Sequence, residues 1–195
     1  MSLAPCDRYY KEILGGKSVN FLPNPTFAHG DVSFNIRNIL DRLRKERKCR
    51  VFVRVDVHFS ETDRVVPDIV VVCDENKLFG GRIVRGAPDL IVEVLSPITR
   101  RRDRYLKKNL YEKYGVPEYW IVHPEEFTVE VYILRGGRYV MDDFYEIPVY
   151  WAFEHMTDEE KATVQYTFSP SMFEDLVVDV REIFEDIDIG GQNEK

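Results

Sequence analysis

Hydrophobic residues in the first quarter of the chain recur with a helical period. Four aliphatic residues stand three or four positions apart, as on one face of an α-helix: Val32, Ile36, Ile39 and Leu43. This stripe predicts an amphipathic helix over roughly residues 28–48. Upstream, YYKEIL and SVNFLP flank Gly15-Gly16 and predict an opening β-hairpin. Pro23 and Pro25 then break the chain before the helix.

Runs of Val, Ile and Leu predict strands in the middle of the chain. The runs are VFVRVDVHF (51–59), VVPDIVVVC (65–73), DLIVEVL (89–95), PEYWIVH (117–123), TVEVYIL (128–134) and RYVMDDFY (138–145). The second and third runs are almost continuously apolar, which is typical of strands covered on both faces. Residues 74–87 are polar and contain glycine, so they predict a loop, and Gly136-Gly137 predicts a hairpin turn.

A second helix is predicted over residues 99–114. Ser96-Pro97 ends the strand before it, and Gly115 is a typical helix stop. Beyond residue 145 the chain alternates short strand-like pieces, TVQYTF and LVVDV, with turns. It closes on the polar segment GGQNEK, which we expect to fray. A helix, a run of strands, a helix and more strands predict a mixed α/β fold with a central sheet.

Composition excludes several classes of protein. The chain has 195 residues, of which 44% are hydrophobic and 31% charged, so it can form a packed core of one domain. No apolar run approaches the ~20 residues of a membrane span, and the N-terminus lacks the pattern of a signal peptide. The cysteines are Cys6, Cys49 and Cys73. Their odd number and the absence of CxxC spacing argue against disulfides and a zinc site, and favour a reducing cytoplasm.

Charge is distributed unevenly along the chain. The net charge of -7 argues against a nucleic-acid partner. However, residues 41–50 carry six bases and two acids, and residues 99–113 carry seven bases and two acids. Residues 141–195 hold fifteen acids against three bases. The two basic runs are either solvated helix faces or, if they flank one site, contacts for a polyanion.

Asp68 and Glu93 each interrupt a strand that is otherwise aliphatic. A carboxylate in a buried strand is costly unless it is paired, hydrogen-bonded or bound to a metal. If the two strands are neighbours, both groups can point at one spot, where a divalent cation would relieve their repulsion. The alternative is an ion pair or a strand position facing water. Pro67 fits a strand that starts, bends or lies at an edge there.

Lys107 is the third candidate. On the predicted helix it is aligned with Asp103 and Tyr111, next to an apolar stripe of Leu106, Leu110 and Tyr114. It therefore lies at the border of the buried face, from which its ammonium can reach a site on the sheet. The alternative is an ordinary ion pair with Asp103 four positions earlier.

Several segments resemble a known family. They are YKEILGG, PNPTFAHGDV, VPDIVVVCDENK, GAPDLIVEVLSPITRRRDRYLKKNLYEKYGVPEYWIV and SPSMFEDLVVDVREIF. Over most of its length the chain resembles the Uma-type family of bacterial restriction-endonuclease-like proteins, within the PD-(D/E)XK nuclease superfamily. The resemblance implies a central mixed β-sheet flanked by helices, with an N-terminal hairpin and additional C-terminal strands. It implies one domain over residues 1–189 and a polar tail at 190–195.

The resemblance also implies roles for individual residues. Asp68 and Glu93 match the family's metal-binding acids, with the carbonyl of Val94 as a further ligand. The superfamily's usual lysine position holds Leu95 here, and the family instead supplies a lysine from the next helix, which matches Lys107. The family also has an acid and a histidine near its start, which match Glu12 and His29. Three roles stay open for Glu12: holding a water, a second ion or Lys107 itself. The alternative for His29 is a capping or satisfied core histidine. His123 departs from the family, which usually has an acid there.

The chemistry that the resemblance implies is Mg²⁺-dependent hydrolysis of phosphodiester bonds in DNA, with Mn²⁺ expected to substitute. Lys107 would orient or activate water and offset negative charge. The residues expected to contact the DNA backbone are Arg100, Arg101, Arg102, Arg104 and Lys108. Two alternatives stay open: a non-cleaving module that binds nucleic acid or protein, and a purely structural ion-pair cluster. A homodimer would supply two sites for two strands, but the sequence shows no interface.

Overall fold

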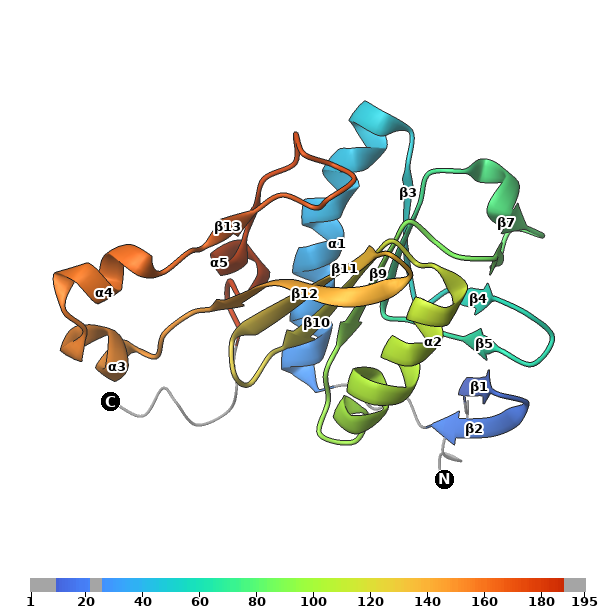
Figure 1. Cartoon of the computed structure of the whole chain (residues 1–195), viewed down its shortest axis with the longest axis horizontal. Coiled ribbons are helices and arrows are strands. Elements are labelled where there is room, and N and C mark those ends of the chain that lie inside the picture. The colour runs from blue at the N-terminus through green and yellow to red at the C-terminus, as the bar shows by residue number, and fades with distance from the viewer. Residues whose placement is uncertain (1–9, 22–25, 188–195) are drawn as a thin grey trace, which may run out of the picture.

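The computed structural model describes residues 10–21 and 26–187, and Figure 1 shows how their helices and strands are arranged. The predictions about Cys6, Pro23, Pro25, the side chain of Leu43 and the GGQNEK tail lie outside the described residues. Within them, the mixed α/β fold is confirmed. No helix in these ranges combines the length and hydrophobicity that crossing a membrane requires.

A mixed six-stranded sheet forms the centre of the fold. In spatial order its strands are β12 (Arg138–Glu146), β11 (Thr128–Arg135), β10 (Glu118–His123), β9 (Leu90–Val94), β6 (Ile69–Val72) and β3 (Arg50–Val53). Neighbouring strands are antiparallel except β9 and β10, which are parallel. A parallel pair needs a crossover connection, and this one contains helix α2 (Lys108–Tyr114).

Two helices cover the two faces of this sheet. Helix α1 (Phe27–Arg47) packs Val32, Ile36 and Leu40 against one face, which includes Val71 and Val92. Helix α2 packs Leu110 and Tyr111 against the other face, which includes Val70 and Ile91. Successive strand residues point to opposite faces, so β6 and β9 are buried on both sides. This confirms the prediction made from their continuous apolar runs.

A second six-stranded sheet lies beside α2. Its spatial order is β2 (Lys17–Phe21), β1 (Tyr10–Leu14), β5 (Arg64–Val65), β4 (Asp56–His58), β8 (Ile83–Arg85) and β7 (Leu78–Phe79). The predicted opening hairpin is confirmed, with Leu14 paired to Lys17 around the Gly15-Gly16 turn. Val57 and Val84 of this sheet share a hydrophobic core with Tyr111 of α2. The hairpin therefore reaches the same side of the central sheet as α2.

Two runs predicted as single strands are each divided between the two sheets. The first run divides at Arg54, whose backbone takes the left-handed conformation with φ of 52°. The second divides at Pro67, which has no N–H to continue a ladder, and β6 begins two residues later. The predicted loop at 74–87 holds a short 3-10 helix, η1 (Glu75–Lys77), followed by β7 and β8.

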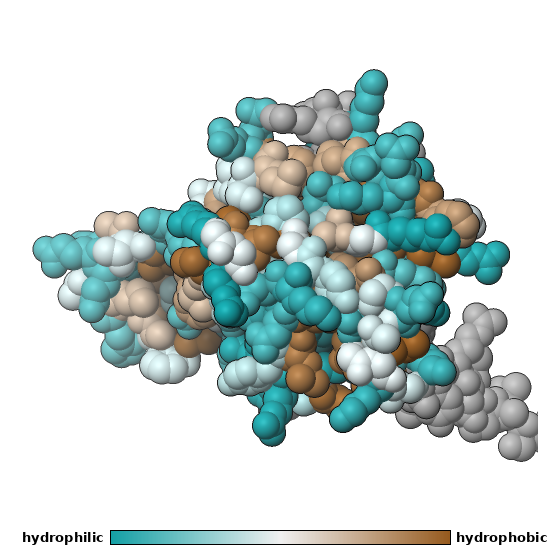
Figure 2. Space-filling model, turned by 45° about the vertical axis from the view of Figure 1, so that its right-hand side comes forward, coloured by the Kyte–Doolittle hydropathy of each residue, from teal (hydrophilic) through white to brown (hydrophobic). Residues whose placement is uncertain are grey.

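The C-terminal part contains helices that the hydrophobic pattern did not predict. Helices α3 (Tyr150–His155) and α4 (Asp158–Thr163) project from the left side of the molecule in Figure 1. Figure 2 shows hydrophobic and hydrophilic patches side by side on this lobe. Thr157 and Glu160 form a capping box, a local start signal that hydropathy does not register.

The chain then returns to the central sheet. The last elements are β13 (Thr167–Phe168), β14 (Val178–Asp179) and α5 (Val180–Ile183). Phe168, Val178 and Ile183 pack into the same core as α1. The C-terminal segment thus completes the hydrophobic layer on the α1 side of the sheet.

Cys49 and Cys73 form a disulfide bond that closes a sequence separation of 24 residues. The expectation of unpaired cysteines was therefore wrong. The two residues lie next to Arg50 and Val72, which are paired across the antiparallel strands β3 and β6. Spacing along the chain does not show such a cross-strand neighbour. The cysteines consequently lend no support to the expected reducing compartment.

Candidate active site

Lys107 lies at the centre of a buried group of carboxylates. Its Nζ is 2.8 Å from Glu93 Oε1, 3.1 Å from Glu12 Oε1 and 3.5 Å from Asp103 Oδ1. We call these four residues the Lys107 cluster. All four side chains are at most 3% exposed. Their members are up to 95 positions apart along the chain (12 to 107), so only the fold brings them together.

Three elements position the Lys107 cluster. Strand β1 of the opening hairpin carries Glu12, strand β9 of the central sheet carries Glu93, and the helix after β9 carries Asp103 and Lys107. The backbone N–H of Val66 donates to Glu12 Oε1 at 3.0 Å. This bond holds the glutamate against the second sheet while its carboxylate faces Lys107.

The helix that carries Lys107 is not a regular α-helix. Residues Arg102–Lys107 form a π-helix, η2, in which the N–H of Lys108 donates to the carbonyl of Asp103 five positions earlier. This wider turn changes which side chains face the sheet. Leu106, predicted on the buried stripe, is 60% exposed, whereas Lys107 is fully buried rather than at the border. The prediction for Leu106 was wrong because it assumed an α-helical period.

Tyr111 completes the environment of Glu93. Its hydroxyl donates to Glu93 Oε1 at 2.6 Å, so both hydrogen bonds that Glu93 receives from described side chains fall on Oε1. Tyr111 itself is fully buried. Glu93 is thus fixed from one side by an ammonium and a phenol hydroxyl.

Asp68 is held by a separate set of donors. The N–H of Val94 donates to Asp68 Oδ2 at 3.0 Å, and His29 Nε2 lies 3.2 Å from the same oxygen. Arg54 Nε lies 3.7 Å from Asp68 Oδ1. His29 is 7% exposed and stands at the start of α1, where its own N–H donates to the Thr26 side chain. The helix therefore brings a histidine to the candidate acid, as expected for a residue that reaches the sheet.

The register of β6 and β9 relates the two candidate metal ligands. The strands are antiparallel with Ile69 opposite Val92, so Asp68 and Glu93 are the next residues outward on facing strands. By alternation Glu93 shares a face with Ile91, which lies in the core on the α2 side. Asp68 immediately precedes β6, and its carboxylate contacts His29 of α1. The condition that the two strands be neighbours is met.

The electrostatics of the site reflect an excess of acid. Burial raises the pKa of Glu93 to about 8; the Lys107 ammonium opposes this, and Asp103, Asp68 and Glu12 add to it. Burial likewise raises the pKa of Asp103. Burial also acts to raise the pKa of Asp68, but contacts with His29, Lys107 and the N–H of Val94 outweigh it and lower that pKa.

The surroundings of Lys107 raise its pKa. Burial acts to lower its pKa, but Glu93, Asp103 and Glu12 outweigh burial and raise it. Its ammonium form is therefore stabilised. Beside it, Arg102 lies 3.5 Å from Glu12 Oε2 and 3.8 Å from Asp103 Oδ1.

The donor set suits a hard divalent cation. Glu12 Oε2 and Asp103 Oδ1 are buried and have ion-pair contacts with Arg102 or Lys107, but they accept no hydrogen bond within the described residues. The four acids Asp68, Glu93, Glu12 and Asp103 outnumber by one the cations beside them, which are Lys107, Arg102 and Arg54. Within the described ranges, no three His, Cys, Asp or Glu side chains are placed to hold one metal ion. A site of Asp68, Glu93 and a carbonyl fits Mg²⁺, which takes one or two carboxylates and keeps several waters.

The five expected DNA-contacting residues divide into two groups. Arg100 and Arg101 are exposed. The other three are engaged within the protein. Arg102 lies against Glu12, Arg104 pairs with Glu130 at 2.7 Å, and the Lys108 ammonium lies 3.5 Å from the centre of the Tyr132 ring.

The basic run at 41–50 does not flank this site. It extends from the C-terminal end of α1 to the first residue of β3, whereas His29 stands in the first turn of α1. Thirteen residues of α-helix separate His29 from Arg42, which is about 20 Å at the usual rise. Arg42 pairs instead with Glu182 at 2.8 Å. The idea that both basic runs border one site is therefore not supported by their positions.

Three further residues contact the candidate acids or depart from expectation. No local sequence signal singles out Arg54, which reaches Asp68 through a turn between two strands of different sheets. Tyr111 was detectable as a helix position aligned with Lys107, but its bond to Glu93 depends on the fold. His123 lies 3.4 Å from Glu126 in its own turn. Because this position departs from the family's usual acid, we expected His123 to have little part in the site, and this local contact is consistent with that.

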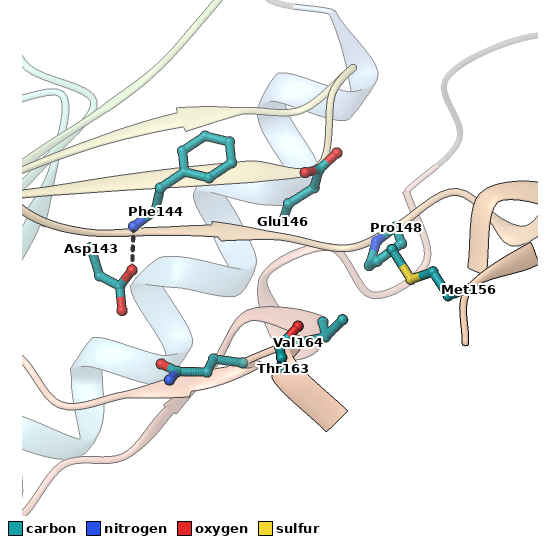
Figure 3. A pocket seen from close by; sticks show the side chains of 8 residues that line it. Asp143, Phe144, Glu146, Pro148, Met156, Thr163 and Val164 are labelled. Carbon is teal, nitrogen blue, oxygen red and sulfur yellow. Dashed lines mark hydrogen bonds between the residues drawn. The ribbon is translucent and has the colours of Figure 1, made fainter. Parts of the chain in front are cut away.

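A separate cavity of about 310 Å³ lies between the end of β12 and the α4 region (Figure 3). Phe144 and Glu146 lie on one side of β12 and Asp143 lies on the other. The side chains that line it include these two acids and no basic residue. A phosphodiester would meet only negative charge there, so this cavity does not suit a nucleic-acid substrate.

Comparison with known proteins gives three results. Residues 8–160 match the family Uma2, described as "Putative restriction endonuclease". Among curated proteins none matches the chain. The solved structures that match include the crystal structure of a "putative nuclease belonging to DUF820" from Anabaena variabilis ATCC 29413, with a TM-score of 0.66, 22% identity and 89% of each chain covered.

At that identity the structural likeness shows the fold alone, and it confirms the predicted fold class. The family match extends over most of the chain and includes Glu12, Asp68, Glu93 and Lys107. Family and fold together point to a restriction-endonuclease-like nuclease. The chain thus belongs to the Uma2 restriction endonuclease family.

Proposed function

We propose that this protein is a Mg²⁺-dependent DNA endonuclease that hydrolyses phosphodiester bonds. One observation carries the proposal: a fully buried lysine, Lys107, is shared by Glu93 and Glu12 next to Asp68 on the adjoining strand. Burying more carboxylates than the neighbouring Lys107, Arg102 and Arg54 can neutralise is costly for stability alone. The same arrangement presents an ammonium and two candidate metal ligands to a phosphate.

Asp68, Glu93 and the carbonyl of Val94 would hold the ion, and Mn²⁺ would substitute for Mg²⁺. When bound, the ion polarises the scissile phosphate and lowers the pKa of a coordinated water. The Val94 N–H and His29 keep Asp68 in place. Tyr111 and Lys107 fix Glu93 through Oε1, so Oε2 would be the oxygen available to a cation.

Lys107 acts through its positive charge. Its three carboxylate neighbours favour the ammonium form, which donates hydrogen bonds and stabilises negative charge on the phosphorane-like transition state. A general base would need the opposite shift of pKa. We therefore assign Lys107 to orienting water and to charge stabilisation. Glu12 positions this ammonium from the opposite side to Glu93.

Substrate would first meet the exposed Arg100 and Arg101. Arg102, Arg104 and Lys108 contribute only after exchanging their internal partners for phosphates. Backbone phosphate contacts position a duplex but do not read its sequence. We also propose that residues 1–189 act as one domain, because Phe168, Val178 and Ile183 share the α1 core.

The test is cleavage of supercoiled plasmid with Mg²⁺ or Mn²⁺ and with EDTA. Wild type should nick the plasmid only with the metal, and Asp68→Ala, Glu93→Gln and Lys107→Met should each reduce the rate at least about 100-fold. Glu118→Gln is the matched control, because Glu118 is an equally buried strand glutamate bound to Trp120 and Ser171. Salt-sensitive DNA binding without metal-dependent cleavage would instead indicate a non-cleaving binding module.

A further inference from the structure

A small cavity opens directly beside Asp68. It has a volume of about 220 Å³ and lies between the first half of α1 and the turn that follows β3. Helix α1 contributes Gly30, Phe34 and Arg37, the end of β3 contributes Val53, and the turn after it contributes Arg54. His29 and Asp68 form the end of the cavity that adjoins the candidate active site.

Two of the side chains that line this cavity, Phe34 and Val53, are apolar and exposed to solvent, and we call them its floor. Phe34 is 63% exposed and Val53 is 44% exposed. Phe34 does not belong to the stripe of α1 that packs on the sheet. A single exposed apolar residue needs no explanation, but these two lie together at the edge of a proposed active site. An exposed phenyl ring is a surface on which any nucleobase can stack.

Two guanidinium groups border the floor. Arg54 has a φ of 52°, a left-handed conformation that glycine adopts with much less strain. Its N–H donates to the carbonyl of Asp68 at 3.0 Å, and its Nε lies 3.7 Å from the Asp68 carboxylate. Strained residues of this kind concentrate at functional sites. The fold thus keeps an arginine side chain between the cavity and the candidate metal ligand.

Arg37 borders the cavity from α1. It lies one helical turn after Phe34 and is 3.5 Å from the half-exposed Asp41. The cavity therefore combines exposed apolar side chains with two guanidinium groups, each of which lies beside one carboxylate, Asp41 or Asp68. That is the complement of a nucleotide, which has an uncharged aromatic base and an anionic phosphate.

We propose that this cavity binds one unstacked nucleobase of a nucleic-acid strand, next to the phosphodiester that lies at Asp68 and Glu93. The base stacks on Phe34 and Val53, and Arg37 and Arg54 contact its phosphate. This inference rests on the proposed nuclease function and defines the substrate class of that same site. The cavity is smaller than the ~300 Å³ lower bound of most drug-sized ligand sites, which suits a single base.

A base inside a duplex cannot reach this cavity while it is stacked and paired. A single strand, or a duplex position with a mismatch, gives up its base at lower cost. We therefore expect the enzyme to bind and cut single-stranded or locally unpaired nucleic acid better than a matched duplex. The preference should depend on Phe34.

The first experiment measures binding of the full chain to a fluorescein-labelled 12-nucleotide single strand by anisotropy, with EDTA present. Phe34→Ala should weaken binding by about 5- to 150-fold, the range of one base–aromatic stack, and Phe34→Tyr should restore it. Phe79→Ala is the matched control, because Phe79 is also half-exposed and lies beside an arginine, Arg85. Equal affinity of Phe34→Ala and wild type would overturn the inference.

Gly30 offers a second variant that fills the cavity without disturbing the core. A Cβ placed on Gly30 meets no atom within 4 Å, so Gly30→Leu should fold and obstruct the base. Gly30→Ala is its control, because it has the same change in helix propensity but leaves most of the cavity open. Gly30→Leu should lose single-strand affinity while thermal unfolding shows the variant to be folded. Unchanged affinity in folded Gly30→Leu would contradict the inference.

A strand series with one abasic position at a time locates the stacked base. At one position, removing the base should weaken binding to wild type by as much as the Phe34→Ala substitution does. The same abasic strand should bind the Phe34→Ala variant no more weakly than the intact strand does.

Cleavage assays then separate the two proposals. If wild type cuts nucleic acid but the Phe34 and Gly30 variants match it, only the base pocket is wrong. If Phe34-dependent binding occurs without any cleavage, only the nuclease function is wrong.

Discussion

The N–H of Gly15 donates to Asp63 Oδ1 at 2.6 Å, across 48 positions of the chain. The other carboxylate oxygen accepts from the Tyr114 hydroxyl at 2.7 Å and from Lys113 at 3.2 Å. Asp63 therefore joins the turn of the hairpin that carries Glu12 to the end of the helix that follows Lys107. One buried carboxylate helps to set the distance between two members of the Lys107 cluster.

Replacing Asp63 should reduce the free energy of unfolding by an amount that depends on pH. Burial acts to raise the pKa of Asp63, but hydrogen bonds from Gly15, Tyr114 and Lys113 outweigh it and lower that pKa below its ordinary 3.8. A lowered pKa stabilises the folded state above pH 3.8, and this contribution disappears as the pH falls through the folded-state value. Asp63→Asn should therefore lose about 1 to 3 kcal/mol at pH 7.

Urea unfolding at pH 7, 5 and 3 measures this effect. The difference between wild type and Asp63→Asn should be constant at the two higher values and smaller at pH 3. Asp56→Asn, an exposed acid on β4, should differ from wild type by less than about 0.5 kcal/mol throughout. A difference for Asp63→Asn that does not change with pH would refute the charge-based explanation.

Lys107 and Glu93 should respond oppositely to substitution in the absence of metal. Lys107→Met leaves Glu12, Glu93 and Asp103 without their ammonium, so unfolding free energy should fall by about 3 to 5 kcal/mol. Glu93→Gln removes one acid from a surplus, and Lys107 keeps Glu12 at 3.1 Å. Its stability should match or exceed that of wild type.

Chemical unfolding in EDTA gives both values, with Glu118→Gln as the buried-acid control. Equal losses for Lys107→Met and Glu93→Gln would indicate a balanced ion pair. That result would favour a structural role for the cluster over a site prepared for a cation.

Divalent metal should stabilise the folded protein through Asp68 and Glu93. A ligand that binds only the folded state adds about 2.7 kcal/mol at 100 times its Kd, which for a chain of this size raises Tm by about 5 to 11 °C. Thermal melts over a MgCl₂ or MnCl₂ series should show this rise in wild type. Asp68→Ala and Glu93→Ala should show no rise, and an equal rise in both variants would remove them as ligands.

The disulfide between Cys49 and Cys73 should contribute to stability. Closing a loop with a separation of 24 residues restricts the unfolded chain, which corresponds to about 3 kcal/mol. Reduction with dithiothreitol should lower the Tm of wild type. It should leave the double variant Cys49→Ser, Cys73→Ser unchanged. If dithiothreitol has no effect on wild type, the bond is absent or carries no stabilisation.

The sequence by itself determined the elements and the family. Continuous aliphatic runs fix which strands are buried on both faces, and a period of three to four residues fixes α1, because these patterns are local. Asp68 and Glu93 stand out for the same reason, since a charge in an aliphatic strand is visible in one line of sequence. The long central segment from PDLIVEVLSP to YGVPEYWIV then identified the family.

The tertiary structure decided how these residues meet. The π-helical turn buries Lys107 and exposes Leu106, which depends on how the helix packs rather than on its residues alone. The cross-strand pairing of Cys49 with Cys73, the reach of Arg54 to Asp68 and the approach of Glu12 to Lys107 all join distant segments. Such contacts are set by the packing free energy of the whole fold, and no local pattern of hydrophobic and polar residues encodes them.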